Sequence, residues 1–304
     1  MKRRVTLWLI FIVLAFVVMV GCAKGASKLQ IKSKAASMVV DLNNAKELPK
    51  HFRKVNDKIN TEASKLPSLE GLADLKASGS AQFSEEGLKL VKQAIGESMS
   101  ITVVDLRQEL HGFVNGMAVS LGGGNNNGTK VLTIEELAAD EKSKLKTIPL
   151  GKSLAFNNKN NVTVVPTKVE NEEELVNSEG MSYIRIPVID GKKPTNDRVD
   201  YFIQFAKSTL EDRWLHFHCR QGIGRTTTFM VMYDIMKNCK KVTLEDIIDR
   251  QVLIGGKNLM EDTKKIEVYA IKRSEFIEEF YKYCKENKDN YETTWSQWFQ
   301  KNHR

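Results

Sequence analysis

The chain has 304 residues, 41% of them hydrophobic, with 19 Gly and 6 Pro, which is long enough for one large domain or two small ones. This composition excludes a disordered chain, a collagen-like repeat and a protein with many membrane spans. The net charge of +8 belongs to the N-terminus, because residues 1–60 hold 12 Lys and Arg against 3 Asp and Glu, whereas residues 61–304 hold 34 against 35, so nucleic acid is not an expected partner.

Residues 1–21 have the layout of a signal peptide, with three basic residues at 2–4 before an apolar run at 5–20. A helix of that run would rise about 24 Å, which is short of the roughly 20 residues that span a membrane comfortably. Cleavage after export is therefore expected rather than a permanent helical anchor. Gly21 precedes Cys22 as in the bacterial lipobox, and this resemblance implies a lipoprotein that is lipidated at Cys22.

Residues 22–37 contain four lysines and few large apolar residues, which predicts a flexible basic stalk before a folded domain at 38–304. The charge of the stalk would favour anionic lipid headgroups beside a lipid anchor. We therefore expect an extracytoplasmic, membrane-anchored lipoprotein, with a secreted or periplasmic protein as the alternative.

Beyond residue 37 the hydrophobic periodicity alternates between helical and extended patterns. Helical patterns cover residues 84–96, 133 onward, 172–176, 197–208, 229 onward and 264–285. Extended patterns cover residues 101–104, 162–165, 183–188 and 214–218, and a run of Gly and Asn at 122–128 indicates a loop. Strands separated by helices predict an α/β fold with a parallel sheet flanked by helices on both faces.

Cys239 and Cys284 lie in helical patterns, where buried free thiols are expected. Four cysteines in a chain of this length do not indicate a disulfide framework. Pairing of these two cysteines stays an open alternative.

A glycine-rich loop follows the strand at 214–218 and leads into a helix that starts near Thr226. It reads His-Cys-Arg-Gln-Gly-Ile-Gly-Arg-Thr from His218 to Thr226. In an open parallel sheet, ligands bind beyond the carboxyl ends of the strands, where loop amides and a helix N-terminus attract an anion. We therefore expect a phosphate-binding loop formed by Arg220, Gln221, Gly222, Ile223 and Gly224.

Cys219 is the candidate nucleophile of this loop. The loop amides, the helix dipole and Arg225 all stabilise a thiolate, and such surroundings lower the pKa of a thiol from about 8.5 to about 3.5–7.5. The planar guanidinium of Arg225 can hold two phosphoryl oxygens, and it does so best in the flattened transition state. Thr226 can donate to the sulfur when it leaves, and His218 is expected to fix the loop through a hydrogen bond to the backbone.

Hydrolysis also needs a proton for the leaving oxygen, and Asp190 is the candidate donor. It lies 29 residues before Cys219, just after the strand at 183–188. A carboxylic acid on a separate loop can protonate the leaving group and, as a carboxylate, then deprotonate the attacking water. Asp197 and Asp200 compete for this role but suit the first turn of the next helix better.

The segment from His218 to Thr226 is similar to the Cys-x5-Arg-Thr loop of the protein-tyrosine-phosphatase superfamily, whose general-acid loop stands where Asp190 does. Further blocks narrow the resemblance to the bacterial phosphatase-like inositol polyphosphatases, also called cysteine phytases. These blocks are residues 105–116, 214–219, 249–256 and 294–298. The resemblance covers residues 48–298, which is nearly all of the chain beyond the stalk.

This resemblance implies a fold and an activity. The implied fold is a phosphatase-like α/β domain with a parallel-rich central sheet and a small partial β-barrel insert around residues 112–165. The implied activity is the stepwise hydrolysis of myo-inositol hexakisphosphate and lower inositol polyphosphates through a phosphocysteine intermediate. Neither a metal nor a cofactor is expected to take part.

Several residues outside the loop are expected to bind the polyanionic substrate. Lys192 adds positive charge beside the candidate acid, and the superfamily uses a glutamine at the place of Gln251 to position the hydrolytic water. The remaining candidates, drawn from regions that contact substrate in the family, are Arg53, Lys265, Tyr269 and Arg273. Each has the alternative of a solvated surface charge or a polar helix residue. The chain departs from the family at Arg220, where an acidic residue is common.

Two other functions stay open at this point. A protein tyrosine or dual-specificity phosphatase would need an aromatic or deep slot beside the loop. A non-catalytic phosphate-binding module would need neither a thiol nor an acid, so the joint presence of Cys219, Arg225 and Asp190 argues against it.

Overall fold

The structure is a computed structural model that describes residues 38–59, 66–122, 132–157, 162–210, 212–261 and 267–303, with the backbone alone at 267–272. The signal peptide predicted at 1–21, the lipidation predicted at Cys22 and the stalk predicted at 22–37 all fall outside the described residues. In the part of the chain that is described, none of the helices has the length and apolar character needed to cross a membrane.

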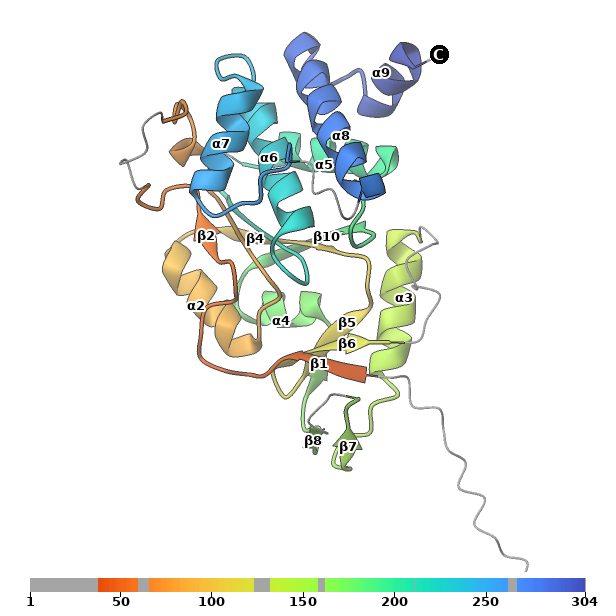
Figure 1. Ribbon diagram of the computed structural model, residues 1–304. Coiled ribbons are helices and arrows are strands. Elements are labelled where there is room, and N and C mark those ends of the chain that lie inside the picture. Colours follow the sequence, from red (N-terminus) through yellow and green to blue (C-terminus); the bar gives the residue numbers. More distant parts are fainter. Residues whose placement is uncertain are drawn as a thin grey trace, which may run out of the picture. The chain divides into compact units, whose positions relative to one another are not determined.

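A mixed central sheet organises the domain, and four of its five strands are parallel (Figure 1). Its order is β10-β4-β11-β3-β2, with β3, β4, β10 and β11 parallel and the short β2 antiparallel at the edge. The strands are β2 (Arg53–Lys54), β3 (Ala77–Ser80), β4 (Ile101–Arg107), β10 (Ser182–Val188) and β11 (Trp214–His218). The predicted α/β class with a parallel-rich sheet is confirmed.

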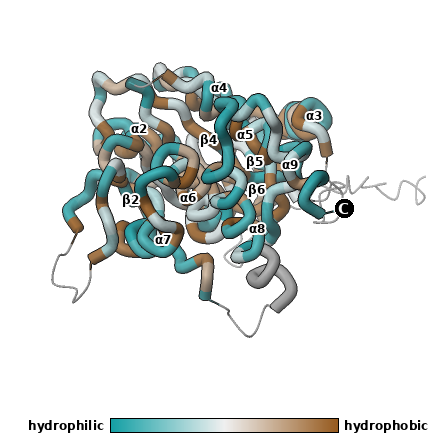
Figure 2. The backbone as a smooth tube through the Cα atoms, turned by 90° about the horizontal axis from the view of Figure 1, so that it is seen from above, coloured by the Kyte–Doolittle hydropathy of each residue, from teal (hydrophilic) through white to brown (hydrophobic). Residues whose placement is uncertain are grey.

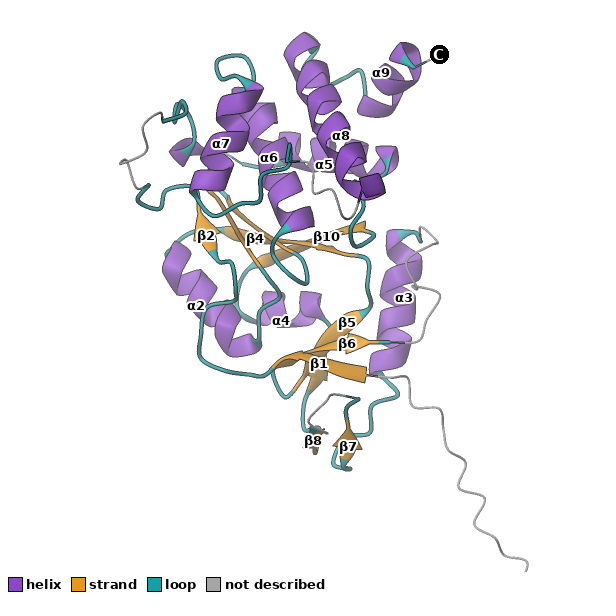
Figure 3. Cartoon of the chain, viewed as in Figure 1, coloured by secondary structure: helices purple, strands orange, loops and turns teal. Residues whose placement is uncertain are grey.

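Helices cover both faces of this sheet, as Figures 1 and 3 show. Helices α6, α7 and α8 lie on one face, and α2 and α4 lie on the other. Helix α6 is buried along most of its length, and α5 packs against β10 and α9. The bounds are α2 (Glu85–Ile95), α4 (Glu172–Ser178), α5 (Asn196–Ser208), α6 (Gly224–Asn238), α7 (Leu244–Leu253), α8 (Glu267–Glu286) and α9 (Trp295–Asn302), with a 3-10 turn η1 at Ala73–Leu75.

A second, antiparallel sheet of order β1-β6-β5-β9 packs with α3 around a core of its own. The predicted insert at 112–165 falls in this region, but the sheet also takes β1 and β9 from outside that range. Strand β1 pairs with β6 across about 80 residues of sequence, and no local pattern indicates that pairing. The bounds are β1 (Met38–Leu42), β5 (His111–Val114), β6 (Met117–Leu121), α3 (Ile134–Leu145), β7 (Leu154–Ala155), β8 (Thr163–Val164) and β9 (Val169–Glu170).

Local sequence explains where several helices begin. Ser84 and Thr133 cap α2 and α3 by accepting hydrogen bonds from backbone N–H groups three residues later, which satisfies donors that have no partner inside the helix. Figure 2 shows hydrophilic and hydrophobic stretches alternating along α2 and α3, as expected for helices with one face on a core. Cys239 and Cys284 are both buried free thiols.

Candidate active site

The loop after β11 is bent tightly against the neighbouring strand β3. Gly222 has a φ of +71°, and a Cβ atom there would lie 2.2 Å from the backbone nitrogen of Ala81. Only glycine satisfies both the left-handed backbone and this close approach. Helix α6 begins at Gly224 without a side-chain cap, so the N–H groups of its first turn remain available to an anion at the loop.

Cys219 lies at the centre of the loop and is only 2% exposed. Its sulfur accepts a hydrogen bond from the backbone N–H of Gly222 and another from Oγ1 of Thr226, each at 3.2 Å. Burial raises the pKa of this thiol, but the charge of Arg225 and the hydrogen bonds from Thr226 and Gly222 outweigh it, and the net shift is downward. The residues around the sulfur therefore favour the nucleophilic thiolate.

Arg225 is buried beside Cys219 and is held on several sides. Its Nη1 donates to the carbonyl oxygen of Val188 at 2.9 Å, and its Nη2 lies 3.0 Å from Oδ1 of Asp190. Its Nε is buried and has no hydrogen-bond partner among the described residues. A buried donor without a partner is costly, and a phosphoryl oxygen in the loop would satisfy it.

Glu109 is a site residue that the sequence analysis did not identify. Its carboxylate accepts a hydrogen bond from each terminal nitrogen of Arg225, both at 2.7 Å. Burial raises the pKa of Glu109, but the charge and hydrogen bonds of Arg225 lower it by more. The net pKa therefore lies far below the usual range. Its position in the sequence indicates this role, because it lies two residues beyond β4, at the carboxyl edge of a parallel sheet and within the 105–116 block of the family resemblance.

The candidate acid Asp190 lies on the loop between β10 and α5 and contacts Arg225 directly. Its side chain is 67% exposed, which leaves it open to an incoming substrate. Arg273 of α8 donates from Nη2 to the carbonyl oxygen of Lys192 at 3.2 Å, and a Cβ on Gly224 would lie 3.2 Å from its Nη1. Arg273 thus lies between the acid loop and the phosphate loop.

The competing acids Asp197 and Asp200 have other partners. Asp197 lies 3.3 Å from Arg198, and Asp200 accepts hydrogen bonds from Ser296 at the start of α9. Both belong to the first turns of α5, as the sequence indicated.

Arg53 supports the loop from behind and does not reach an accessible surface. It is 3% exposed, and it donates to the carbonyl oxygen of Gly222 at 2.9 Å and to Oγ1 of Thr227 at 3.1 Å. Burial lowers its pKa to about 10, while Cys219 acts in the opposite direction. The structure therefore shows Arg53 holding the backbone of the phosphate loop rather than exposed for the expected contact with substrate.

Gln251 is also buried, and its Nε2 donates to Oδ2 of Asp234 at 3.0 Å. Asp234 lies ten residues beyond the first residue of α6, about 15 Å along the helix, and it also pairs with Arg250. The amide nitrogen of Gln251 is thus bonded to a carboxylate of α6, and a role in positioning the hydrolytic water stays a prediction. Lys265 and the side chain of Tyr269 lie outside the described residues.

The expected hydrogen bond from the His218 ring to the loop backbone is absent from the described part of the chain. Its Nε2 contacts Oε1 of Glu172 at 2.5 Å and lies 3.8 Å from Oδ1 of Asp105. These three buried residues could be considered a set of metal ligands. However, two donors bound to one ion at about 2.1 Å each lie roughly 3 Å apart, so a contact this short is a direct pair of His218 with Glu172.

Ionic contacts continue on the far side of Glu172. Its Oε2 accepts from Nε2 of Gln82 at 2.9 Å and lies 3.0 Å from Nε2 of His111. Burial raises the pKa of Glu172, but the two histidines lower it well below the usual range. The residue before the nucleophile is therefore anchored to α4 through a buried carboxylate.

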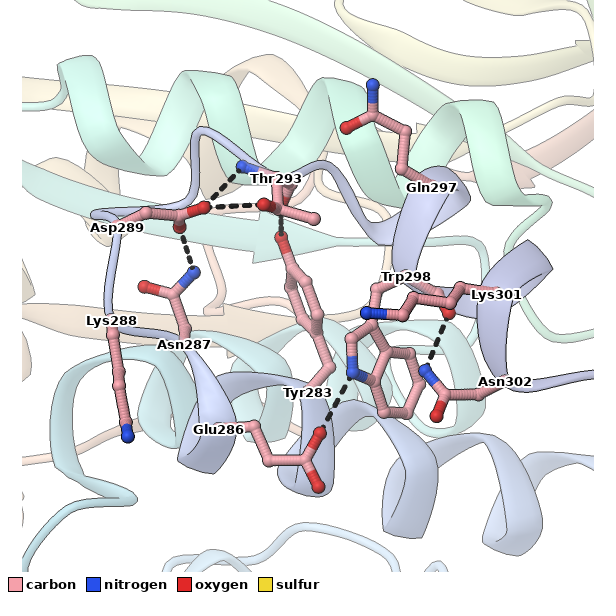
Figure 4. A pocket seen from close by; sticks show the side chains of 10 residues that line it. All are labelled: Tyr283, Glu286, Asn287, Lys288, Asp289, Thr293, Gln297, Trp298, Lys301 and Asn302. Carbon is pink, nitrogen blue, oxygen red and sulfur yellow. Dashed lines mark hydrogen bonds between the residues drawn. The ribbon is translucent and has the colours of Figure 1, made fainter.

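A cavity of about 450 Å³ lies away from this loop, at the end of α8 and along α9 (Figure 4). Its carboxylates already have partners, because Glu286 accepts from Nε1 of Trp298 and Asp289 accepts from Thr293 and Asn287. It contains none of the residues around Cys219, so it is separate from the reactive centre.

Comparison with known proteins places these observations in a family. The family described as PTP-like phytase, inositol hexakisphosphate, matches residues 104–237. A PTP-like phytase from Bdellovibrio bacteriovorus is 31% identical, with a TM-score of 0.71 over 87% of this chain and 94% of that one. A PTP-like myo-inositol phosphatase from Mitsuokella multacida, solved with myo-inositol-(1,3,4,5)-tetrakisphosphate, is 34% identical, with a TM-score of 0.75 over 86% of this chain.

Some of the similar proteins are longer. The chain spans 48% of the Mitsuokella protein and 57% of effector protein hopD2 of Pseudomonas syringae pv. tomato, to which it is 29% identical over 269 residues.

Proposed function

This chain belongs to the PTP-like phytase family, and from that premise we propose that it removes phosphate stepwise from myo-inositol hexakisphosphate and lower inositol polyphosphates. The observation that carries the proposal is the convergence on Arg225. Its guanidinium contacts the candidate acid Asp190 at 3.0 Å, and its charge lowers the pKa of the Cys219 thiol. The inositol tetrakisphosphate bound by the Mitsuokella relative supports the substrate class.

In the first step the Cys219 thiolate attacks phosphorus. A sulfur–phosphorus bond forms, the bond between phosphorus and the inositol oxygen breaks, and Asp190 gives its proton to that oxygen. The incoming phosphate competes with Asp190 for Nη2 of Arg225. A phosphoryl oxygen also accepts a hydrogen bond from Nε of Arg225. The charge that develops on the equatorial oxygens faces the loop amides and Arg225, which are already oriented before reaction.

In the second step a water molecule attacks the phosphocysteine, and the Asp190 carboxylate accepts its proton. The sulfur–phosphorus bond breaks, inorganic phosphate forms and the thiolate returns. The hydrogen bonds from Thr226 and Gly222 to the sulfur, both 3.2 Å long, stabilise the leaving thiolate. This accounts for a pair of donors aimed at one sulfur atom.

Phosphate release from inositol hexakisphosphate tests the proposal, with a phosphotyrosyl peptide as the competing substrate and Cys219→Ser as the control. Release from the inositol ester supports the proposal. Release from the peptide alone would identify a protein phosphatase, and binding without release from either would identify a phosphate-binding module.

We also propose that the protein is exported and anchored by a lipid on Cys22. The basic and apolar pattern at residues 1–21 supports this, together with the glycine before the cysteine. Labelling cells with a radioactive fatty acid tests it. Label on the wild type that disappears in Cys22→Ala is expected, and unlabelled wild type would contradict the anchor.

A further inference from the structure

Arg220, the residue directly after the nucleophile, is held by a carboxylate of the second sheet. Its Nη2 lies 3.0 Å from Oδ1 of Asp41 in β1. The side chain of Arg220 is 44% exposed, whereas that of Asp41 is 4% exposed. The pair therefore fixes an accessible guanidinium where the two sheets meet, beside the phosphate loop.

Asp41 also forms an ion pair with a second guanidinium, that of Arg107. Its Oδ2 lies 3.2 Å from Nη2 of the fully buried Arg107 and accepts from Oγ of Ser120 at 2.5 Å. Nη1 of Arg107 donates to Oε1 of Gln82 at 2.7 Å, and the backbone N–H of Gln82 donates to the carbonyl oxygen of Arg220. The Asp41 carboxylate thus lies between two guanidinium groups. That of Arg107 is buried, and that of Arg220 is exposed to solvent.

A cavity of about 280 Å³ adjoins this pair. It is lined by Val40, Asp41, Leu42, Glu47, Leu48, Pro49, Lys50, Ala81, Gln82, Arg220 and Gln221. Sites that take a whole small molecule measure about 300–1,000 Å³, so this one suits a substituent of a substrate rather than the whole substrate. Because Arg220 and Gln221 also belong to the phosphate loop, a group bound here would lie close to the phosphate under attack.

We propose that this cavity is a subsite for a second phosphate of the substrate, in which Arg220 donates to the phosphate and Asp41 positions Arg220. The inference rests on the proposed function, since it needs a substrate with closely spaced phosphates. An exposed arginine ordinarily loses considerable side-chain entropy when it binds, and the contact with Asp41 reduces that cost in advance. A substrate with a single phosphate leaves the subsite empty.

Binding measurements in the Cys219→Ser background test the subsite without turnover. Titration calorimetry compares Cys219→Ser with Cys219→Ser/Arg220→Gln, using inositol hexakisphosphate and inorganic phosphate as probes. We expect Arg220→Gln to weaken the binding of inositol hexakisphosphate about tenfold, which is the size of one charge-assisted hydrogen bond. The binding of inorganic phosphate should weaken less than about twofold. Equal weakening of both probes, or of neither, would overturn the proposal.

The matched control is Arg213→Gln, which removes the same charge just before β11, at the opposite end of that strand. Arg213 contacts Thr102 and Ser182 and has no part in the cavity. The control is expected to bind both probes as the parent does. Arg220→Lys keeps the charge but loses the planar fork, so an intermediate loss for inositol hexakisphosphate is expected.

The Asp41→Asn variant tests whether Asp41 acts only by positioning Arg220. In that case Asp41→Asn changes the affinity for inositol hexakisphosphate relative to inorganic phosphate when residue 220 is Arg, and has no effect on it when residue 220 is Gln. A preference that still changes in the double variant would remove Asp41 from this role. The two hypotheses fail separately: wild type inactive on inositol hexakisphosphate contradicts the proposed function, whereas an active wild type with unselective Arg220→Gln contradicts only the subsite.

Discussion

Glu109 and Arg225 form a two-point ion pair in which each terminal nitrogen of the guanidinium donates to one carboxylate oxygen at 2.7 Å. Two parallel hydrogen bonds fix the plane of the guanidinium as well as its position. Arg185 donates from Nη2 to the backbone carbonyl of Glu109 at 3.0 Å, so the segment that carries the carboxylate is itself held. Arg225 is thus oriented before any phosphate binds.

Replacement of Glu109 by Gln should lower kcat on inositol hexakisphosphate. A misplacement of about 1 Å in a reacting group costs roughly 100-fold, so a loss of about 10- to 100-fold is expected from a guanidinium that is no longer held at two points. Initial rates of phosphate release measure this. The exposed Glu97→Gln is the charge-matched control, and a Glu109→Gln enzyme as fast as this control would show that the pair has no role in turnover.

Asp190→Asn should slow poor leaving groups more than good ones. An inositol oxygen needs a proton as it departs, whereas a nitrophenolate leaves without one, so the general acid contributes mainly to the first. We expect a loss of about 100-fold or more on inositol hexakisphosphate and a clearly smaller loss on 4-nitrophenyl phosphate. Losses of equal size on the two substrates would remove Asp190 from the acid role.

Alkylation by iodoacetamide should distinguish the three cysteines of the domain. The net shift of the Cys219 pKa is downward, so its thiolate persists to lower pH than that of an ordinary cysteine. Burial raises the pKa of Cys239 and of Cys284, so both should react later and only at higher pH. Mass spectrometry of each peptide across pH 5–10 reports this order.

Glu172→Gln should destabilise the fold and do so in a pH-dependent manner. The folded-state pKa of Glu172 is depressed, so its contribution is present above the unfolded pKa of about 4.3 and is lost as the pH falls toward the folded value. Denaturant unfolding at pH 6.5 should show a loss of roughly 3–5 kcal/mol, because His111 and His218 lose a buried partner. The gap between variant and wild type should narrow at pH 3, and a constant gap would contradict the ion-pair account.

The sequence predicts the reactive loop well because its chemistry is local. The nine residues from His218 to Thr226 contain the nucleophile, both glycines and the arginine, and the strand and helix around them follow from simple periodicity. The helical pattern at 84–96 and the strand at 183–188 are equally local, and the structure shows α2 and β10 there.

The remaining features depend on contacts between distant segments. A basic residue in a substrate-contacting block has the same sequence signal whether it faces solvent or braces a backbone, so the burial of Arg53 behind Gly222 was not foreseeable. Lys193, a further basic residue close to the candidate acid in the sequence, places its ammonium over the rings of Phe276 and Phe299 at 5.6 and 5.7 Å. The pairing of Asp41 with Arg220 depends on β1 joining a sheet formed mostly from residues after 110.

The central claim is that Cys219 hydrolyses inositol polyphosphates, and the appearance of inorganic phosphate from inositol hexakisphosphate tests it most directly. The wild type should release several equivalents in succession, with lower inositol phosphates visible by chromatography, and Cys219→Ser should release none. An inactive wild type, or a Cys219→Ser variant as active as the wild type, would contradict it.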